Sequence, residues 1–327
     1  MIHGHLLVTG ATGFLGSSVV DAVVSAGISV RATDLSPDCG ISSVEYRQAD
    51  ITKHEALEAL LENTTIVIHV AGLAHIFYST TNAGEKFQQI NEQGTANVVS
   101  AAAAAGVQHL ILISSVSVYG PHTEGMYDEN TPCNPIGPYA LSKYNAELRA
   151  IEIARESGIA LTVLRLATLY GEGDPGNVRR LVGTLDKGRF LWIGDGRNQK
   201  SLLYKGDAAR ACIAVVEKPA SGINIYNVSA PPCTMHEIVA GITDALGKNP
   251  FPVRVPASLA LFLSRQLSWV PNRRLADIHQ IVKKWLAEDI YDTRRFEKAY
   301  GFQATTSLKD GLKREVDWYL KTVKGEG

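Results

Sequence analysis

The sequence predicts an α/β fold in which a doubly wound parallel sheet forms the larger unit and a smaller, mostly helical C-terminal cap follows. Strand-like apolar runs alternate with helical patterns from residue 5 to about residue 170. Several of these runs are apolar throughout, which is typical of parallel strands covered by helices on both faces. After Tyr170 the alternation gives way to a glycine-rich loop and irregular helices. We therefore predict a sheet unit at 1–171 plus about 201–232, and a cap at about 172–200 plus 233–327.

Each element of the sheet unit can be placed by its pattern. The expected strands are 5–10, 28–34, 65–72, 109–120 and 160–171. The expected helices are 19–27, 54–63, 87–106 and 139–158, and Gly27 and Gly106 stand where a helix would end. A further helix and strand, 201–216 and 223–228, are expected to return to the sheet.

Composition and charge narrow the range of partners. The 327 residues are enough for about two domains. With 45% hydrophobic and 20% charged residues, the profile is that of an ordinary globular protein. The net charge of −1 argues against a nucleic-acid partner and against binding to an anionic membrane surface. A small-molecule substrate is the expected partner.

The cysteines and the apolar segments bear on location. Four scattered cysteines lack any metal-finger or redox spacing, so we expect free thiols in a reducing cytoplasm and no metal site. No charged-then-apolar signal precedes the first strand. The most apolar later segment, VPASLALFLSRQLSWV at 255–270, has an uncharged core too short to span a bilayer. It is expected to be a packed helix.

Three glycines follow the first strand. Gly10, Gly13 and Gly16 lie in the turn between a strand and a helix, where unpaired N–H groups and the helix dipole favour an anion. A residue without a side chain lets the backbone approach a pyrophosphate closely, as in a Rossmann dinucleotide-binding fold. The Gly-x-x-Gly-x-x-Gly spacing is one residue longer than the usual fingerprint. A plain tight turn is the alternative interpretation.

Asp34 ends the second strand, 18 residues after Gly16. A carboxylate there can accept hydrogen bonds from the diol of an adenosine ribose and would repel a 2′-phosphate. The position therefore favours NAD over NADP as the cofactor. A solvated turn residue or a helix cap is the alternative.

The stretch PYALSK places Tyr139 and Lys143 four residues apart on a predicted helix, so both share one face. That helix's expected apolar stripe, which leaves the pair facing a cleft, is Ala140, Tyr144, Leu148 and Ile151. A phenol ordinarily has a pKa of about 10. A nearby ammonium and a positive nicotinamide ring would both lower that pKa. Tyr139 could then remove a substrate proton while hydride leaves for the cofactor. An ordinary surface pair is the alternative.

A cluster of serines ends the strand before that helix. Ser114, Ser115 and Ser117 lie in ISSVSVYG, at the carboxyl edge where ligands bind in open α/β sheets. Ser115 is well placed to hydrogen-bond the reacting oxygen beside Tyr139. Local backbone capping is the alternative for a single serine.

These residues belong to a larger set of motifs. The chain resembles the extended short-chain dehydrogenase/reductase family, in particular its branch of NAD-dependent nucleotide-sugar epimerases and dehydratases. The motifs run in the family's order over almost the whole chain, the last two more loosely: GATGFLG, DI at 50–51, HVAG, INEQGT, SSVSVYG, PYALSK, LRLATLYGEGD, GDGRNQKSLLYKGD and YNVSAPPCTMHEIV.

The resemblance implies a role for each matching position. The cofactor is expected to be NAD, lined at its pyrophosphate by Gly10, Gly13, Phe14, Leu15 and Gly16. Asp34 would hold the adenosine ribose, Asp50 and Ile51 would flank the adenine, and Ala71 and Gly72 would pass near the nicotinamide side. Tyr139 and Lys143 would also bind the nicotinamide ribose, with Ser115 as the third catalytic member. Asn91 would be a structural position, either orienting Lys143 or making a helix-packing hydrogen bond. Family members often form homodimers through the helices near 86–105 and 139–155.

The substrate side departs from the family's pattern. Val116 and Ser117 stand where the dehydratases carry an acidic pair, which argues against 4,6-dehydration. Thr168 replaces an asparagine that contacts the diphosphate, and Lys200 with Ser201 replaces an Arg-Asp pair. Lysine can still bind a phosphate as a point charge, without arginine's bidentate contact. Arg179, Arg180 and Arg197 either compensate or are solvated. Ser115, Ser117, Thr168 and Lys200 are the candidate substrate contacts, and Asp207 is expected to be a helix N-cap.

Three functional interpretations follow. The first is a nucleotide-sugar epimerase that oxidises a sugar hydroxyl transiently and recycles NAD. The second is a net NAD(P)-dependent oxidoreductase, such as a 4-keto-sugar reductase or a hydroxysteroid-type alcohol dehydrogenase. The third, a non-catalytic NAD-binding regulator, is disfavoured by the intact set of Ser115, Tyr139 and Lys143.

Overall fold

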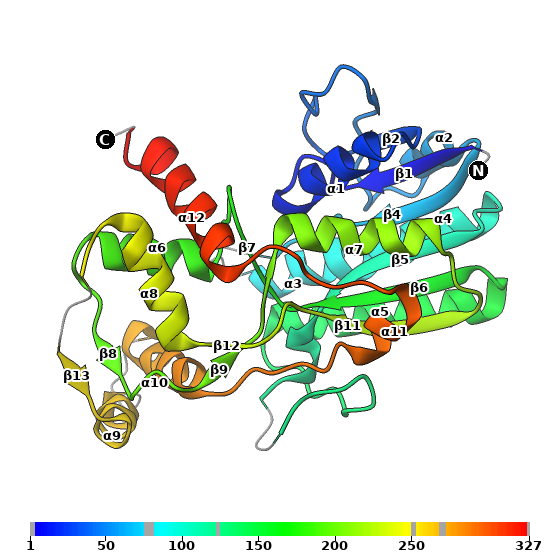
Figure 1. Ribbon diagram of the computed structural model, residues 1–327. Helices are drawn as coiled ribbons and strands as arrows, with labels where there is room; N and C mark the ends of the chain where they lie inside the picture. Colours follow the sequence, from blue (N-terminus) through cyan, green and yellow to red (C-terminus); the bar gives the residue numbers. More distant parts are fainter. Residues whose placement is uncertain (1–3, 75–81, 122–124, 250–252, 268–272, 326–327) are drawn as a thin grey trace. The chain divides into compact units, whose positions relative to one another are not determined.

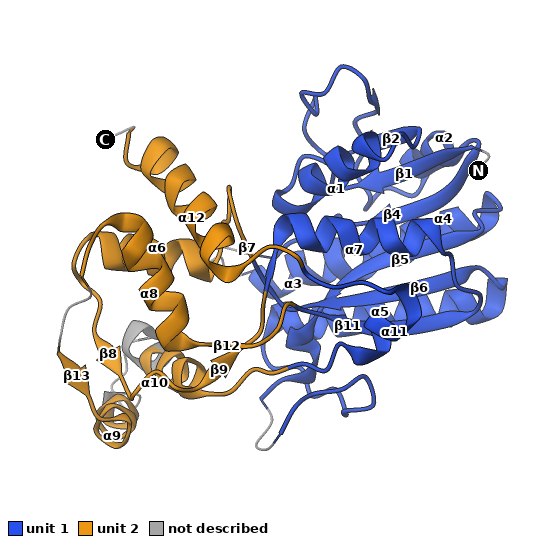
Figure 2. Ribbon diagram, in the orientation of Figure 1, with its two compact units in different colours: residues 1–169, 203–229, 291–304 blue, residues 170–202, 230–290, 305–327 orange. Residues whose placement is uncertain are grey.

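The computed structural model describes residues 4–74, 82–121, 125–249, 253–267 and 273–325. These residues form two compact units, shown in blue and orange in Figure 2. Unit 1 comprises 1–169, 203–229 and 291–304, and unit 2 comprises 170–202, 230–290 and 305–327. The chain passes from one to the other near β7 (Thr168–Tyr170) and returns near β10 (Leu202–Tyr204).

Unit 1 is built on a seven-stranded sheet whose paired strands are all parallel (Figure 1). The strand order is β11-β6-β5-β4-β1-β2-β3. The strands are β1 (His5–Thr9), β2 (Val30–Thr33), β3 (Glu45–Tyr46), β4 (Thr64–His69), β5 (His109–Ser115), β6 (Ala160–Leu166) and β11 (Ile223–Val228). The expected doubly wound parallel sheet is therefore present, and its order reverses beside β1.

Helices cover both faces of this sheet because each central strand is apolar on both sides. On β1, Leu6 and Val8 face one core cluster while Leu7 faces the other. The first cluster is completed by α1 (Phe14–Ser25), α7 (Lys205–Glu217) and α11 (Arg294–Tyr300). The second is completed by α2 (Glu55–Leu61), α4 (Gly94–Ala104) and α5 (Pro138–Ser157). Burial of continuous apolar strands between two helical layers fixes the sheet's register.

The expected helix at 87–106 is not one regular helix. It consists of α3 (Ala83–Phe87), a π-helical turn η1 (Gln88–Gln93) and α4. The turn carries Asn91, which is 1% exposed and hydrogen-bonded to the loop after β4 and to α5. Such single π-helical turns often occur at functional sites.

Unit 2 is mostly helical, as Figure 1 shows. Its helical elements are α6 (Asn177–Asp186), α8 (Met235–Leu246), α9 (Ala257–Leu267), α10 (Arg273–Leu286), α12 (Leu308–Trp318) and the π-helical turn η3 (Tyr319–Val323). Four two-residue strands pair as β9 (Gln199–Lys200) with β12 (Cys233–Thr234) and β8 (Trp192–Ile193) with β13 (Arg254–Val255).

One segment corrects the predicted division of the chain. We expected all of 233–327 in the cap, but 291–304 belongs to unit 1. The reason is aromatic burial, because Phe296 is 0% exposed and Phe302 is 7% exposed in the first core cluster. Phe296 also packs edge-on against Tyr226 of β11. The sequence pattern of α11 did not distinguish it from the helices of unit 2.

Candidate active site

The turn between β1 and α1 requires glycine for two different reasons. Gly10 has φ +70°, and a Cβ there would lie 2.6 Å from the backbone of Ala71. A Cβ on Gly16 would overlap the Gly10 carbonyl oxygen. Gly13 is the N-cap of α1 and supplies no side-chain cap, so the first-turn N–H groups of α1 remain available to an anion. Leu15 faces the core, whereas Lys205 lies over the Phe14 ring at 5.5 Å.

Asp34 directly follows β2 and lies beside this turn. Both the backbone N–H and the hydroxyl of Thr12 donate to one of its carboxylate oxygens, at 2.9 and 2.6 Å. The Leu35 N–H donates to the other oxygen at 2.7 Å. The carboxylate is therefore held in a fixed orientation at the carboxyl end of β2.

Asp50 and Ile51 form a local turn after β3. The N–H and hydroxyl of Thr52 donate to Asp50 at 2.9 and 2.7 Å, which lowers the pKa of the Asp50 carboxyl. Asn97 on α4 donates to the Ile51 carbonyl oxygen at 3.1 Å. The Asp50 carboxylate thus stabilises the turn, and the turn is attached to α4.

A buried histidine that the sequence reasoning missed supports the loop after β4. The Ala71 N–H donates to the Thr9 hydroxyl at 3.2 Å, and that hydroxyl is hydrogen-bonded to His69 Nδ1 at 2.7 Å. His69 Nε2 is hydrogen-bonded to the Thr95 hydroxyl at 3.0 Å. Burial, aided by the charge of Lys143, lowers the pKa of His69 to about 3. This neutral relay fixes the Ala71 backbone against Gly10.

Asn91 links the same loop to the helix that carries Tyr139. Its amide nitrogen donates to the Leu73 carbonyl at 2.9 Å and to the Ser142 hydroxyl at 2.9 Å, and its amide oxygen accepts the Leu73 N–H at 2.7 Å. Asn91 is therefore a packing position, the second of its two expected roles. A Cβ at Gly72 would lie 3.1 Å from the Asn91 amide oxygen and 3.8 Å from Lys143 Nζ.

Ser115, Tyr139 and Lys143 meet where β5 ends. Tyr139 and Lys143 both lie in the first turns of α5, and the side chain of Tyr139 is hydrogen-bonded to Ser115. The Ser115 hydroxyl also accepts the Ser117 N–H at 3.2 Å and caps the short helix η2 (Val116–Tyr119). Phe87 packs edge-on against the Tyr139 ring, with the centroids 5.9 Å apart.

The electrostatics of this set differ from the expectation. Burial raises the pKa of Tyr139, and only the hydrogen bond from Ser115 opposes that shift. The ammonium of Lys143 does not lower it here, because Lys143 Nζ donates instead to the Ile113 carbonyl at 2.5 Å. Burial lowers the pKa of Lys143 to about 8, although the charge of Glu147 acts in the opposite direction. A lysine near its pKa at neutral pH can exchange protons.

A buried ionic network lies under Ser115. The Ser114 hydroxyl donates to Glu147 at 2.5 Å, and Arg165 Nη2 pairs with the same carboxylate at 2.7 Å. Arg165 also donates to the Tyr119 hydroxyl at 3.0 Å. Serine, glutamate and arginine on β5, α5 and β6 are thereby joined, and no spacing in the sequence predicts this. The network fixes the end of β5 from which Ser115 projects.

The expected substrate contacts do not all share this environment. Ser117 Oγ is buried and has no hydrogen-bond partner among the described residues. Thr168 is exposed on β7. Lys200 corrects its expected role: it is buried, and its Nζ donates to Asp289 at 2.6 Å and to the Lys284 carbonyl at 2.8 Å. Its charge is therefore neutralised inside unit 2.

The structure also gives the surroundings of Arg197, Arg179 and Asp207. Arg197 is a surface residue near Asp195, at 3.7 Å and with 89% of its side chain exposed. Arg179 is half-buried, and its Nε has no partner within the described part of the chain. Asp207 is not the expected N-cap, because α7 begins two residues earlier at Lys205. Asp207 lies in the first helical turn and pairs with Arg210.

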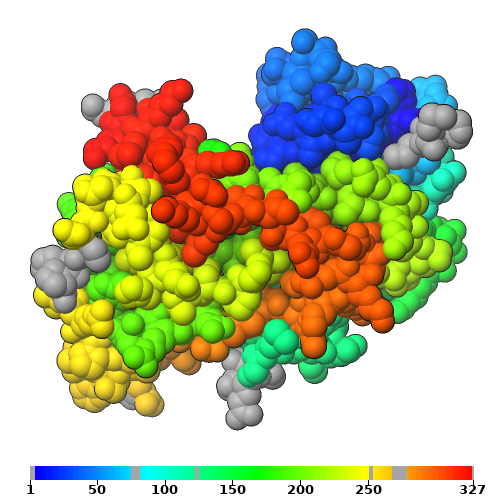
Figure 3. All heavy atoms as spheres, in the orientation of Figure 1, coloured from blue at the N-terminus to red at the C-terminus, as the bar shows by residue number. Residues whose placement is uncertain are grey.

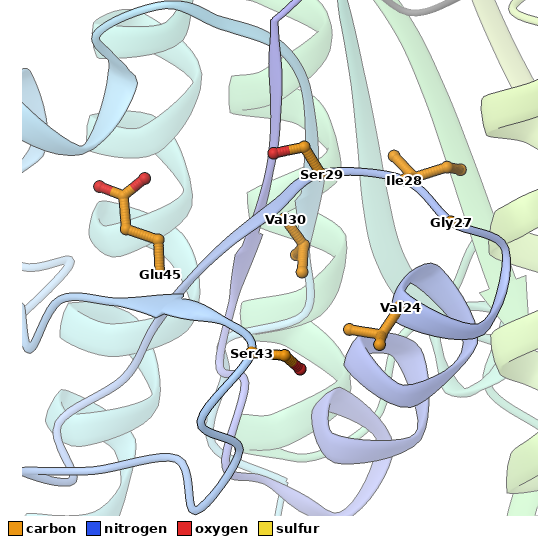
Figure 4. A pocket seen from close by; sticks show the side chains of 7 residues that line it. All are labelled: Val24, Gly27, Ile28, Ser29, Val30, Ser43 and Glu45. Atoms are coloured by element: carbon orange, nitrogen blue, oxygen red, sulfur yellow. The ribbon is translucent and has the colours of Figure 1, made fainter.

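A shallow hollow of about 400 Å³ lies elsewhere on unit 1 (Figure 4). It lies at the amino end of β2 and is lined by Val24, Gly27, Ile28, Ser29, Val30, Ser43 and Glu45. Ligands of open α/β sheets bind at the carboxyl ends of the strands. This hollow is therefore separate from the glycine turn and the Tyr139 set.

Metal and membrane features complete the description. In the described ranges, no group of three or more His, Cys, Asp or Glu side chains could hold a metal ion. No helix among the described residues combines the length and the apolar character needed to cross a membrane.

The parallel sheet, the glycine turn after β1 and the Ser–Tyr–Lys set at the carboxyl edge define the class of extended short-chain dehydrogenases/reductases. Residues 6–229 match the NAD dependent epimerase/dehydratase family. The chain belongs to that family, and its cofactor is NAD. The turn at Gly10 and Gly16 carries no side chains, so its backbone can approach the pyrophosphate of such a dinucleotide.

Known relatives extend the match over nearly the whole chain. N-acetyl-alpha-D-glucosaminyl-diphospho-ditrans,octacis-undecaprenol 4-epimerase of Escherichia coli O157:H7 is 28% identical, covering 99% of this chain and 97% of the relative. 2-Alkyl-3-oxoalkanoate reductase of Stenotrophomonas maltophilia is 28% identical, covering 94% and 97%. The structure of MoeE5 in complex with UDP-glucuronic acid and NAD has a TM-score of 0.78 at 26% identity, covering 98% and 100%.

Proposed function

We propose that the protein is a 4-epimerase-type enzyme that acts on a sugar carried by a diphosphate, by transient oxidation of a sugar hydroxyl. The observation that carries this proposal is the hydrogen bond between Ser115 and Tyr139, with Lys143 one turn further along α5. Val116 and Ser117 follow Ser115 without a carboxylate, so this stretch supplies no acid for water elimination. The E. coli relative and MoeE5 in its complex support a diphosphate-linked sugar as substrate.

The cofactor would be held along the carboxyl edge of the sheet. Gly10, Gly13 and Gly16 would admit the pyrophosphate, with the backbone of Phe14 and Leu15 at the start of α1. Asp34 would accept the hydroxyls of the adenosine ribose. Asp50, Ile51, Ala71, Gly72, Tyr139 and Lys143 would line the remaining length. When bound, NAD supplies a reversible hydride acceptor with a positive ring charge.

The residues of this chain would handle the proton. Tyr139 Oη would take a proton from the substrate hydroxyl, and Ser115 would hold the same oxygen in line. Lys143, with a pKa of about 8, would be mostly protonated at neutral pH. Its ammonium donates to the Ile113 carbonyl in the structure and would have to turn from that oxygen toward Tyr139 to stabilise the phenolate. Once the keto sugar has turned its opposite face to the cofactor, Tyr139 would return its proton to the carbonyl oxygen, and the hydride would return to the carbon on that face, which completes the inversion.

The substrate diphosphate needs a cation that Lys200 does not supply. Lys200 is paired with Asp289, whereas Arg179 Nε is buried without a partner among the described residues. We therefore assign Arg179 as the candidate phosphate contact. Ser117, whose hydroxyl is also unpartnered in the described ranges, and the exposed Thr168 are the candidate sugar contacts.

The experiment that tests this function uses no added cofactor. The purified protein is offered UDP-sugars and a polyprenyl diphospho-sugar, and product is followed by chromatography and reduced nicotinamide by absorbance. Epimerised product without net change in absorbance is the expected result. Turnover that strictly requires added NAD(H) or NADP(H) would overturn epimerisation in favour of the second function.

That second function is a net oxidoreductase acting on a ketone or secondary alcohol. The pairing of Lys200 with Asp289 favours it, because a substrate without a diphosphate needs no cation there. The S. maltophilia reductase is a relative with a similar share of identical residues. Consumption of NAD(P)H with a 3-oxoalkanoate or a keto-sugar, and no epimerase activity, would establish it.

The proposal also includes an oligomeric state and a cellular location. Leu141 and Leu148 on α5 are 49% and 47% exposed, which supports a homodimer formed through α4 and α5. Light scattering of the wild type and of a Leu148→Arg variant tests this assembly. All four cysteines are unpaired, which supports the reducing cytoplasm as its location.

A further inference from the structure

The helix α9 presents its large apolar side chains outward. Leu259, Phe262 and Leu263 are 46%, 60% and 50% exposed, and their spacing places them on one side of the helix. We call these three residues the apolar face of α9. A helix that belonged only to a globular core would bury such side chains.

The small residues of the same helix point inward. Ala260 and Ser264 are buried, and Ser264 is hydrogen-bonded to His279 Nδ1 of α10 at 2.9 Å. The packing of α9 on α10 thus uses alanine and serine. This hydrogen bond fixes the rotation of α9 about its axis, and the apolar face therefore remains exposed. The expected packed helix at 255–270 is therefore found in α9 on its buried side only, and 268–270 lie outside the described residues.

Further apolar and basic side chains adjoin this face. A shallow hollow of about 420 Å³ is lined by Leu261, Phe262, Arg265, His279 and Lys283. In Figure 3 the gold atoms of this part of the chain lie on the surface. Apolar and cationic groups are thus side by side.

The charge of the segment differs from that of the whole protein. Between Val253 and Leu286 the sequence has one acidic residue, Asp277, and six basic ones: Arg254, Arg265, Arg273, Arg274, Lys283 and Lys284. The complete chain has a net charge of −1. A basic amphipathic helix with outward leucine and phenylalanine is the composition that binds in the plane of a membrane interface.

We propose that the apolar face of α9, with Lys283 of α10 in the adjoining hollow and Lys284 next to it in the chain, docks onto an anionic membrane surface. Leucine and phenylalanine would enter the boundary between headgroups and acyl chains, while the lysines would meet anionic headgroups. A second copy of this chain fits less well, because a symmetric contact would bring two basic segments together. This docking revises the expectation from net charge that no membrane is involved, and it does not depend on which reaction the enzyme catalyses.

The test uses the purified full-length protein and lipid vesicles. Sedimentation is measured with vesicles of phosphatidylcholine alone and with vesicles that contain phosphatidylglycerol. We expect binding to the anionic vesicles that weakens with salt. The variant Phe262→Ser/Leu263→Ser should bind at least ~10-fold more weakly, and Lys283→Glu/Lys284→Glu should lose the preference for anionic lipid.

A matched control separates the proposed face from general stickiness. Val323 is 40% exposed on η3. The variant Val323→Ser should bind vesicles like the wild type, and circular dichroism should show the same helix content for all proteins. Wild-type protein that does not sediment with anionic vesicles would overturn the proposal. The proposal would also be overturned if Phe262→Ser/Leu263→Ser bound the vesicles as tightly as the wild type. It would be overturned as well if that variant lost self-association without any change in vesicle binding.

Discussion

Thr12 holds the carboxylate of Asp34 with two hydrogen bonds, from its backbone N–H at 2.9 Å and from its hydroxyl at 2.6 Å. Residue 12 lies in the glycine turn, and residue 34 lies directly after β2. The turn proposed for the pyrophosphate and the carboxylate proposed for the ribose therefore form one connected element. A cofactor that meets one of them meets the other in a fixed orientation.

Replacing Asp34 by alanine should narrow the preference for NAD over NADP. The variant loses charge-assisted hydrogen bonds to the ribose and the repulsion of a 2′-phosphate, so the ratio of the two affinities should fall by roughly 10-fold or more. Fluorescence titration with both dinucleotides measures this ratio. Asp38→Ala, four residues along the same loop, is the control and should leave it unchanged. An unaltered ratio in Asp34→Ala would mean that the ribose is recognised elsewhere.

Replacing Tyr139 by phenylalanine should abolish turnover while the cofactor still binds. This substitution removes only the phenolic hydroxyl and keeps the ring. Loss of a positioned acid or base costs about 10²–10⁴-fold in rate. Turnover and NAD affinity are measured on the same preparation. Tyr144→Phe, on the same helix, should retain both properties. A Tyr139→Phe enzyme with a rate close to wild type would remove Tyr139 from the chemistry.

The sheet could be predicted because its signals are local. Apolar strands covered on both faces appear as continuous runs, and the glycines of the first turn exclude side chains that would collide with Ala71 or Gly10. The position of Tyr139 and Lys143 in the first turns of one helix was likewise visible as a four-residue spacing. These features depend on neighbours in sequence or on steric exclusion, so the sequence carries them directly.

The surroundings of the site depend on partners far away in the sequence. The predicted stripe on α5 included Leu148, but Leu148 is 47% exposed, whereas Lys143 and Glu147 are buried. The buried side of α5 is set by Arg165 on β6 and the backbone of β5, which no helical periodicity reports. Similarly, Lys200 could not be assigned from its motif, because Asp289 lies 89 residues away.

The buried His69 should make the protein sensitive to acid. Its pKa is about 3 in the folded protein, against an ordinary value of 6.5. The unfolded chain therefore takes up this proton as the pH falls below about 6.5, whereas the folded chain does so only near pH 3, and folding is favoured less as the pH falls. At pH 5 this costs about 2 kcal/mol relative to pH 7.

Substitution of His69 isolates that effect. His69→Gln keeps one donor and one acceptor between Thr9 and Thr95 but does not titrate, so its stability should fall less between pH 7 and pH 5. Urea unfolding of both proteins at the two pH values measures the difference. His54→Gln, at an exposed position, should retain the wild-type pH dependence. Equal slopes for wild type and His69→Gln would contradict the neutral relay.

Glu315 in unit 2 should produce the opposite pH dependence. It is 0% exposed, one of its oxygens accepts the Gly171 N–H at 3.0 Å, and burial together with the charge of Asp174 raises its pKa to about 9. Both oxygens of Asp174 already accept backbone N–H groups, so the proton resides on Glu315. The folded protein keeps this proton up to about pH 9, whereas the unfolded chain releases it above about pH 4.5. Folding is therefore favoured progressively less as the pH rises through that interval.

A glutamine at this position has no proton to release. Glu315→Gln should match the wild type near pH 4 and should be more stable at pH 8, by roughly 4–5 kcal/mol. Melting temperatures measured from pH 4 to pH 9 test the divergence, and Glu288→Gln, at an exposed position on the same unit, should follow the wild-type curve. Parallel curves for wild type and Glu315→Gln would show that Glu315 is ionised in the folded protein.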